Sequence, residues 1–436
     1  MKKIFRTLII TLFSATLLGL NQNPASKATP EVWVNIFIHG IVRPVVNVGD
    51  MVNIARQKIK QSRYKHVTRY MRKHNVIHRS QATQDVGLMP IKMEPNPNSN
   101  GPRAMVAIFK KINQLTGNTN AKELYYTFGW SGLLSYSSRQ KAANLLYNKL
   151  VRLVAQLKKE GFAPRIRIVA FSHGGNVAIQ MANFDHWSKL KSKLSIAELI
   201  NLGVPVHKEN DVLIRHPMFK KVYHFYSEGD IPQSLDFVST DYTVSHRRYS
   251  ARRCVTIPDK LTQIQVRFSK TIERKAPFTP ANKYRTLTTD PNHISMWSFG
   301  WTPSGYDKNL PIFPLPTAAL TPYLVHVIKT HPQLGRNLEM DVYPHQEKIT
   351  ITDRKWRDHH KIQEIIIPFM SQAAFNDLKQ TAWTRRPADA VDITGKTVVT
   401  DAIYFATRQR KLQKHCSKTL DCRSKNCTAS CACAVT

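Results

Sequence analysis

The sequence predicts an α/β fold with a mostly parallel central sheet and helices on both faces. From residue 31 to about residue 332, short apolar runs alternate with longer stretches in which apolar residues recur every three or four positions. Such alternation is typical of parallel strands joined by crossover helices. Several of the short runs are apolar almost throughout, as strands buried on both faces of a sheet are. We therefore expect one large α/β domain over 31–332.

The short apolar runs are the predicted strands of this sheet. Each is of strand length and is bounded by turn residues or by a helical pattern. They lie at 32–38, 124–128, 166–171, 197–202, 222–226 and 264–268.

The longest helical pattern lies between the second and third predicted strands. Apolar residues recur there at positions 142, 143, 146, 150, 153, 154 and 157, which places them on one face of a helix. Gly161 and Pro164 end this helix. A shorter pattern over 174–184 predicts the helix after the strand 166–171. Residues 172–174 are then the turn that joins strand and helix.

One region inside the domain does not follow the alternation. Residues 49–102 are rich in Lys, Arg, His, Asn and Pro, and we interpret them as a cap or insertion above the sheet. Within this region, 51–60 and 63–73 have the pattern of short helices, and 95–102 has the composition of a loop.

The C-terminal part is less regular. Residues 311–332 predict a further helix, and 348–352 predict a strand. We treat 333–410 as a C-terminal extension whose role the pattern does not indicate, and 411–436 as a Cys-rich tail. No internal repeat is evident.

The N-terminus has the layout of a secretory signal peptide over residues 1–28. Lys2, Lys3 and Arg6 precede an apolar run at 8–20, and small or polar residues follow. A helix needs roughly 20 apolar residues to cross a bilayer, so a permanent anchor is the less favoured interpretation. We expect an exported protein, periplasmic or secreted.

The chain is strongly basic. Lys and Arg total 64 against 29 for Asp and Glu, which gives a formal net charge of +35. Such a charge creates a positive field that favours an anionic partner, such as a membrane or envelope surface. The basic residues are scattered and do not form one stripe, so no specific nucleic-acid partner is expected. In the densest run, a solvated loop is the default interpretation; it contains His246, Arg247, Arg248, Arg252 and Arg253.

The cysteines are concentrated at the C-terminus. In an exported chain this favours disulfides. The tail lacks a paired C-x-x-C spacing, so we expect no metal. Because the tail has five cysteines, at least one of them cannot form a disulfide within the tail. This cysteine could pair with Cys254, pair with another chain, or stay free. The tail cysteines are Cys416, Cys422, Cys427, Cys431 and Cys433. Because no dinucleotide fingerprint or phosphate-binding loop is present either, no cofactor is expected.

Ser172 lies in the turn between the third predicted strand and its helix. Ala170 precedes it by two positions and Gly174 follows it by two. Small residues at these positions allow the tight strand-to-helix turn, called the nucleophile elbow, that exposes a serine hydroxyl above a sheet. The usual pattern is G-x-S-x-G, and Ala170 departs from it. The context predicts that Ser172 is a nucleophile.

A nucleophilic serine that attacks an acyl group also needs backbone N–H donors for the developing oxyanion. The first predicted strand ends in His39-Gly40, at the same edge of the sheet as Ser172. We expect these donors to be the N–H of His173 and one from Gly40 or Ile41.

Four local features occur together between residues 31 and 300: the His39-Gly40 turn, Phe128-Gly129-Trp130-Ser131-Gly132 followed by Arg139, the Ser172 turn, and Tyr226-Ser227-Glu228-Gly229-Asp230 after a late strand. Through these four features the chain resembles members of the α/β-hydrolase superfamily, specifically its lipases and esterases. The resemblance implies a catalytic triad in the chain order serine, acid, histidine.

On this order, Asp230 is the candidate acid, because it directly follows the strand 222–226 in a turn that contains a glycine. Asp236 is its alternative, and an aspartate that only stabilises its own turn is the structural alternative. His293 is the candidate base, in the loop beyond the strand 264–268. His246 and His326 compete with it.

We expect the chain to hydrolyse carboxylic esters, including lipid esters, through an acyl-enzyme. The same triad could also hydrolyse amides or thioesters. A different class of function stays open as well: a catalytically inactive basic binding protein at an envelope or host surface.

Overall fold

The computed structural model describes residues 29–41, 79–95, 99–119, 121–133, 135–185, 194–234, 245–249, 257–273, 284–301, 306–353 and 363–388. The predicted signal peptide, the predicted helices at 51–60 and 63–73, and all six cysteines lie outside these residues.

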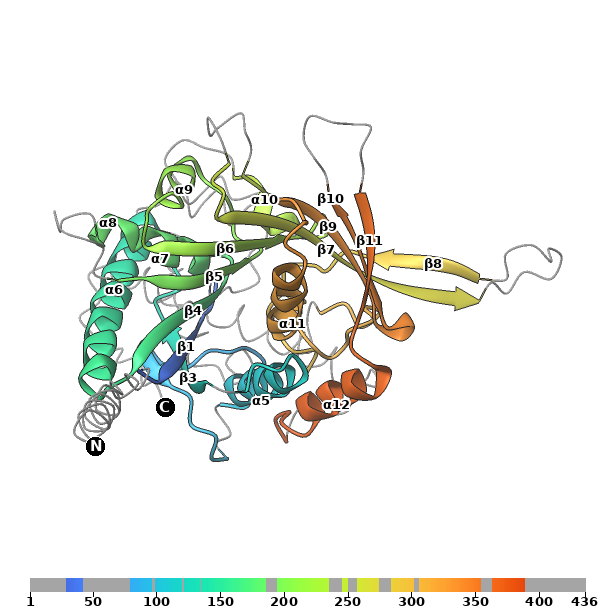
Figure 1. The fold of residues 1–436 in the computed structure, drawn as a ribbon, viewed down its shortest axis with the longest axis horizontal. Helices are drawn as coiled ribbons and strands as arrows, with labels where there is room; N and C mark the ends of the chain where they lie inside the picture. The colour runs from blue at the N-terminus through green and yellow to red at the C-terminus, as the bar shows by residue number, and fades with distance from the viewer. Residues whose placement is uncertain are drawn as a thin grey trace, which may run out of the picture.

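A single mixed sheet runs through the described part of the chain (Figure 1). Its central strands are parallel to their neighbours, as predicted. In spatial order they are β3 (Lys122–Gly129), β1 (Glu31–Ile38), β4 (Ala163–Phe171), β5 (Ile196–Leu202), β6 (Phe219–Tyr226), β7 (Leu261–Glu273) and β9 (Asn337–Tyr343).

Antiparallel strands complete both sides of the sheet. β2 (Gly87–Pro90) pairs with β3 at one edge, and β10 (Lys348–Asp353) and β11 (Gln363–Pro368) follow β9 at the other. β8 (Tyr284–Thr289) pairs with β7. The strands β9 to β11 show that the segment after residue 332 continues the sheet of the main domain.

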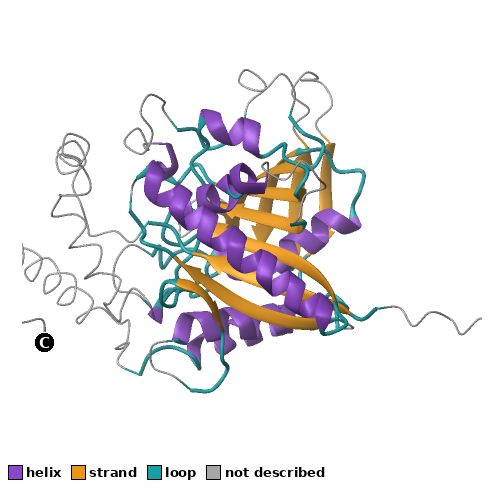
Figure 2. Ribbon diagram, turned by 90° about the vertical axis from the view of Figure 1, so that its left-hand side faces the viewer, coloured by secondary structure: helices purple, strands orange, loops and turns teal. Residues whose placement is uncertain are grey.

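Helices pack against the two faces of the sheet (Figure 2). Alternate residues of β4 enter two different apolar clusters, as a strand buried on both faces requires. Ile168 packs in the cluster with α6 (Tyr136–Lys159) and α7 (His173–Gln180), and Val169 packs in the cluster with α5 (Asn100–Leu115) and α11 (Thr317–Thr330). The predicted helices at both faces are therefore present.

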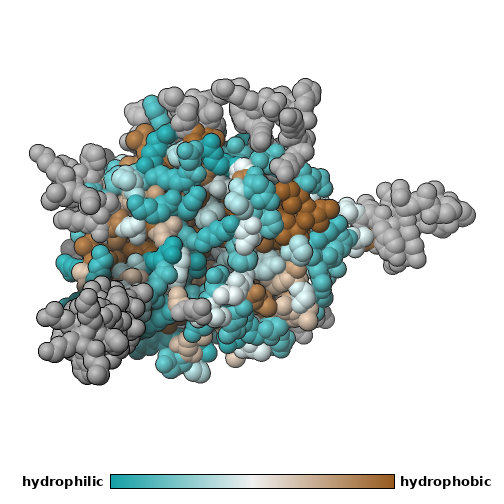
Figure 3. Space-filling view, viewed as in Figure 1, coloured by the Kyte–Doolittle hydropathy of each residue, from teal (hydrophilic) through white to brown (hydrophobic). Residues whose placement is uncertain are grey.

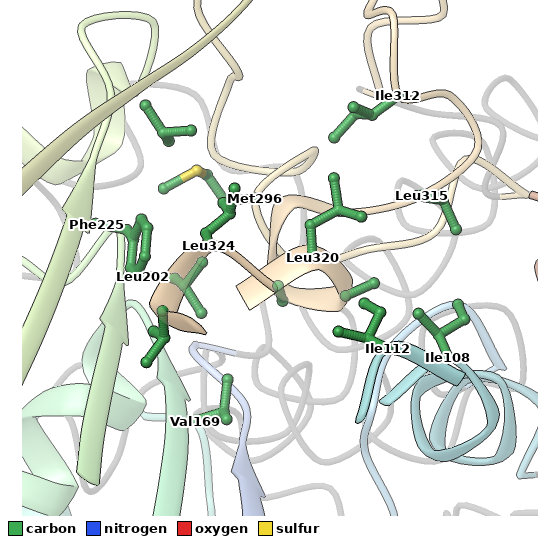
Figure 4. Packing of buried hydrophobic residues seen from close by; sticks show 14 of the residues in the cluster. Ile108, Ile112, Val169, Leu202, Phe225, Met296, Ile312, Leu315, Leu320 and Leu324 are labelled. Carbon is green, nitrogen blue, oxygen red and sulfur yellow. The ribbon is translucent and has the colours of Figure 1, made fainter. Parts of the chain in front are cut away.

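Figure 4 shows the second of these clusters from nearby. Val169, Leu202 and Phe225 come from the sheet, and Leu320 and Leu324 face them from α11. On the face drawn in Figure 3, hydrophilic residues cover most of the described surface and hydrophobic ones gather in small patches. Within the described residues, no helix has the length and apolar character that crossing a membrane requires.

The predicted helix over 142–157 is confirmed as α6, which begins earlier than the apolar pattern. The side chain of Ser135 accepts a hydrogen bond from the N–H of Ser138 (3.4 Å), and such a cap stabilises a helix start. The helix ends before Gly161, which has a φ of 82°. The pattern over 174–184 is divided between α7 and the short α8 (Ala182–Asp185).

The predicted loop at 95–102 is wrong at its C-terminal end, because α5 begins at Asn100. Pro102 lies in the first turn of this helix, where a missing N–H breaks no helical hydrogen bond. The helix α12 (Gln372–Trp383) was not predicted. It packs beside α5, and Lys111 Nζ lies 2.5 Å from Asp377 Oδ2.

Four strands were not predicted: β2, β8, β9 and β11. β9 illustrates the reason, because Glu339 and Asp341 interrupt its apolar residues. Both carboxylates pair with Arg267 of the neighbouring β7, and its Nη2 lies 2.7 Å from Asp341 Oδ2. Charges that are neutralised across a sheet hide a strand from an analysis that looks for apolar runs.

The buried His224 of β6 makes stability depend on pH. Burial lowers the pKa of His224 to about 4, although a hydrogen bond to the Arg247 carbonyl opposes the shift. Well above pH 6.5 the imidazole is neutral in both the folded and the unfolded state. Between pH 6.5 and 4 the unfolded chain binds a proton that the folded protein does not, so stability falls as the pH falls.

We expect His224→Gln to remove this acid-dependent loss. Gln can keep the donor that reaches the Arg247 carbonyl, where His224 Nε2 now lies 2.7 Å from the oxygen. From pH 7.5 to 4.5, urea unfolding should show a loss of stability about 2.5 kcal/mol smaller in the variant than in the wild type. The exposed His345 provides the control variant His345→Gln. Equal pH dependence in all three proteins would contradict the assignment.

Candidate active site

Ser172 occupies the turn between β4 and α7. Its φ of 51° and ψ of −134° place it in a backbone region that residues with a side chain rarely adopt. The turn is held at both ends: Ser172 N–H donates to the Leu202 carbonyl and Gly175 N–H donates to the Ser172 carbonyl, each at 2.9 Å. This is the strained elbow geometry that the sequence predicts.

Neighbouring atoms leave no room for a side chain at Gly174 or Gly175, the two glycines that follow Ser172 in the elbow. A Cβ at Gly174 would lie 2.4 Å from the His39 carbonyl oxygen, and one at Gly175 would lie 2.2 Å from Val204 Cγ2. Glycine is therefore required at both positions. Ala170 stands where the usual pattern has glycine, and its methyl group is fully buried in the apolar cluster against α7, so the departure is accommodated by packing.

Ser172, His293 and Asp230 lie in one hydrogen-bonded chain. His293 Nε2 is 3.1 Å from Ser172 Oγ, and His293 Nδ1 is 2.9 Å from both carboxylate oxygens of Asp230. Because a carboxylate only accepts, Nδ1 carries the proton and Nε2 is left to accept from the serine hydroxyl. The structure thus brings together the three residues that the sequence predicts as a triad.

A tight turn after β6 holds Asp230. Its side chain is completely buried, and Oδ1 accepts from the N–H of Gln233 at 3.0 Å. Gly203 is a residue that the sequence analysis missed: it has a φ of 55°, and a Cβ there would lie 2.5 Å from Asp230 Oδ2. Its position directly after the strand 197–202 was the available signal.

Arg247 was also missed, because its basic run was interpreted as a solvated loop. Its Nη1 lies 3.0 Å from Glu228 Oε2, its Nη2 donates to the Glu228 carbonyl (3.1 Å), and its Nε donates to the Asp230 carbonyl (3.3 Å). Arg247 therefore stabilises the turn that carries the candidate acid. The rest of that run, residues 250–253, lies outside the described residues.

The loop after β8 positions His293. Asn292 Oδ1 accepts from the N–H of Ser295 (2.9 Å), which shapes the turn. The Phe171 ring lies 4.5 Å from the His293 ring, and Trp297 stacks on Phe171 at 5.5 Å. Aromatic packing thus fixes the imidazole beside the residue that precedes Ser172.

The rival candidates do not share this position. His246 lies in an isolated bridge with Val206, and His326 lies on α11. Asp236, the alternative acid, lies outside the described residues.

The loop that follows β1 lies against Ser172. A Cβ at Gly40 would be 2.7 Å from Ser172 Cβ and 3.0 Å from the Phe171 ring. His173 is the first residue of α7, so its N–H belongs to the helix N-terminus, where backbone donors point outward. The structure therefore places Gly40 in contact with Ser172 and His173 directly after it, and Ile41 follows Gly40 in the same loop.

The positive φ of Ser172 predicts that a glycine variant at this position is more stable than an alanine variant. Glycine adopts such a backbone without strain, whereas alanine does not. We expect Ser172→Gly to have a free energy of unfolding about 1 kcal/mol higher than Ser172→Ala, after allowing for the greater flexibility of glycine in the unfolded chain. Urea unfolding of the two variants measures this difference. A more stable alanine variant would contradict the strained turn.

The described residues contain no group of three or more His, Cys, Asp or Glu side chains that could hold a metal ion. Comparison with models of known protein families, and with curated protein sequences, finds no match to this chain. The geometry of the site is therefore the basis for inferring function.

Proposed function

We propose that this chain is a serine hydrolase with the α/β-hydrolase fold that cleaves carboxylic esters through an acyl-enzyme. The observation that carries the proposal is the chain of hydrogen bonds from Ser172 Oγ through His293 to the buried Asp230. A serine, an imidazole and a carboxylate in this order are the arrangement that activates a serine for acyl transfer.

The order of the strands supports the same proposal. The nucleophile follows β4, and the acid follows β6, two positions along the sheet. The base follows the later β8. These positions agree with the chain order serine, acid, histidine that the resemblance to the superfamily implies.

The proposed reaction has two steps. His293 Nε2 takes the Ser172 proton while Oγ attacks the ester carbonyl carbon, and the alcohol leaves with that proton. Water then attacks the acyl-enzyme with His293 again as base, which releases the acid and restores the serine. Asp230 keeps Nδ1 protonated and stabilises the imidazolium that forms. The N–H groups of His173 and of Gly40 or Ile41 stabilise the oxyanion.

The proposed substrates include lipid esters at an anionic surface. This part depends on the predicted export and on the net charge of +35, which attracts the protein to anionic membranes or envelopes. The hydrogen-bonded triad favours catalysis over a role as a basic binding protein, because a binding scaffold needs no base beside a serine.

Matched chromogenic substrates test the proposal. Purified full-length protein is assayed on an acetate ester, a butyrate ester, a thioester and an anilide with similar leaving groups. We expect turnover of at least one ester, with faster hydrolysis of the esters than of the anilide. A higher specificity constant for the anilide would indicate an amidase, and no turnover above that of Ser172→Ala would contradict the enzyme assignment.

A further inference from the structure

His39 has a buried imidazole at the loop that carries two of the candidate oxyanion donors. It is the last residue before Gly40 and is 2% exposed. Its ring stacks on Trp130, with ring centroids 5.9 Å apart and planes inclined by 20°. Trp130 follows β3, so this contact links the loops after two neighbouring strands at the edge of the sheet where Ser172 lies.

Hydrogen bonds fix the protonation of His39. The backbone N–H of Trp130 donates to His39 Nε2 at 3.1 Å. A nitrogen that accepts from an N–H carries no proton, so in a neutral ring the proton is on Nδ1. His39 Nδ1 lies 2.7 Å from the Gly40 carbonyl oxygen, which it therefore donates to. The Trp130 indole N–H in turn donates to the His39 carbonyl at 2.8 Å.

The bond to the Gly40 carbonyl also determines the direction of a neighbouring donor. The Gly40 carbonyl and the Ile41 N–H belong to one planar trans peptide, in which C=O and N–H point in opposite directions. Holding the carbonyl toward the His39 ring therefore directs the Ile41 N–H away from that ring. Gly40 itself lies in contact distance of Ser172, as the 2.7 Å approach of its added Cβ to Ser172 Cβ shows.

We propose that His39, held by Trp130, is a positioning residue that aligns the Gly40–Ile41 peptide so that the Ile41 N–H serves as an oxyanion donor. The inference rests on the proposed function and deepens it, because it selects Ile41 over Gly40 as the donor from this loop. His39 does not touch the reacting atoms; it acts through the peptide.

Two conservative substitutions distinguish the roles of the two ring nitrogens of His39. In His39→Asn, the amide N–H occupies the place of Nδ1 and can keep the bond to the Gly40 carbonyl. In His39→Gln, the amide oxygen reaches the place of Nε2 and can keep the bond from Trp130 N–H, but the donor to Gly40 is lost. We expect His39→Gln to lower kcat on the best ester about 10²-fold with KM nearly unchanged, and His39→Asn to stay within roughly tenfold of the wild type.

An alkylboronic acid gives a second readout that a general loss of structure would not reproduce. Its tetrahedral adduct with a serine places an oxygen where the oxyanion forms, so its affinity reports on the oxyanion donors. His39→Gln should weaken inhibition by about the same factor as it lowers kcat/KM, and thermal unfolding of each variant verifies the fold. Equal kcat values for the Asn and Gln variants, or unchanged boronate affinity in His39→Gln, would overturn the proposal.

If His39→Gln does not fold, the tautomer of His39 in the wild-type protein tests the proposal instead. Nitrogen NMR of protein labelled with ¹⁵N-histidine distinguishes the two neutral tautomers, and His39→Asn assigns the signal. We expect an Nδ1–H tautomer at pH 7.5; an Nε2–H tautomer or a charged ring would overturn the proposal. A wild-type protein without ester turnover would instead refute the proposed function, so the two failures are distinguishable.

Discussion

Ser172→Ala is expected to lower kcat for ester hydrolysis by about 10⁴-fold to 10⁶-fold, the loss seen when a triad serine is removed. The structure gives the reason: Ser172 Oγ is the atom that His293 Nε2 contacts at 3.1 Å. Alanine keeps the backbone of the turn and removes this atom. Initial rates on a chromogenic acetate or butyrate ester, measured with high enzyme concentration, determine the residual activity.

The control for this variant is Ser137→Ala, which changes an exposed serine on α6. It should keep wild-type kcat and KM. If Ser172→Ala kept more than a tenth of wild-type activity while remaining folded, another nucleophile would have to be responsible.

Asp230→Asn should have the second largest effect, a loss of about 10⁴-fold in kcat. Both carboxylate oxygens lie 2.9 Å from His293 Nδ1, so Asp230 selects the tautomer in which Nε2 can accept the serine proton. An amide at this position can donate to Nδ1 and stabilise the opposite tautomer, which cannot act as the base. Because Asn has nearly the same shape, the change should leave the fold intact.

Asp236→Asn is the matched control, because Asp236 is the alternative acid in the sequence; it should retain activity within about twofold of the wild type.

The double variant Ser172→Ala/Asp230→Asn should be no slower than Ser172→Ala alone, since the effects of residues that act as a unit are not additive. A large loss in Asp236→Asn with normal activity in Asp230→Asn would reverse the assignment of the acid.

Much of the parallel sheet was predictable because burial on both faces favours nearly continuous apolar runs, such as residues 168–171 of β4. β9 was missed because only apolar runs were taken as strands. Leu338, Met340 and Val342 alternate there with polar residues, which is itself a strand pattern, and the pairing of Glu339 and Asp341 with Arg267 of β7 lets the charged positions lie within the sheet. The start of α5 was hidden for a different reason: Pro102 is compatible with both a loop and the first turn of a helix.

The candidate triad was predictable to the extent that each member is tied to a strand end. Ser172 has a local pattern of its own, and Asp230 and His293 followed from the chain order that the resemblance implies. Gly203 and Arg247 could not be identified in this way. Both matter because they lie close to Asp230: Gly203 leaves room for its carboxylate, and the Arg247 guanidinium donates to its carbonyl. The sequence signals only that Gly203 follows a predicted strand, and it does not indicate that either residue approaches Asp230.

Labelling by a fluorophosphonate probe tests the central claim most directly, because the probe reacts with a serine that a neighbouring base has activated. Tryptic digestion after Arg167 and Lys189 isolates a peptide that contains Ser172 and Ser188, and fragmentation distinguishes the two. We predict stoichiometric modification of Ser172 in the wild type, none in Ser172→Ala, and strongly slowed modification in Asp230→Asn. A folded wild-type protein that stays unmodified, or that carries the probe at another serine, would contradict the account.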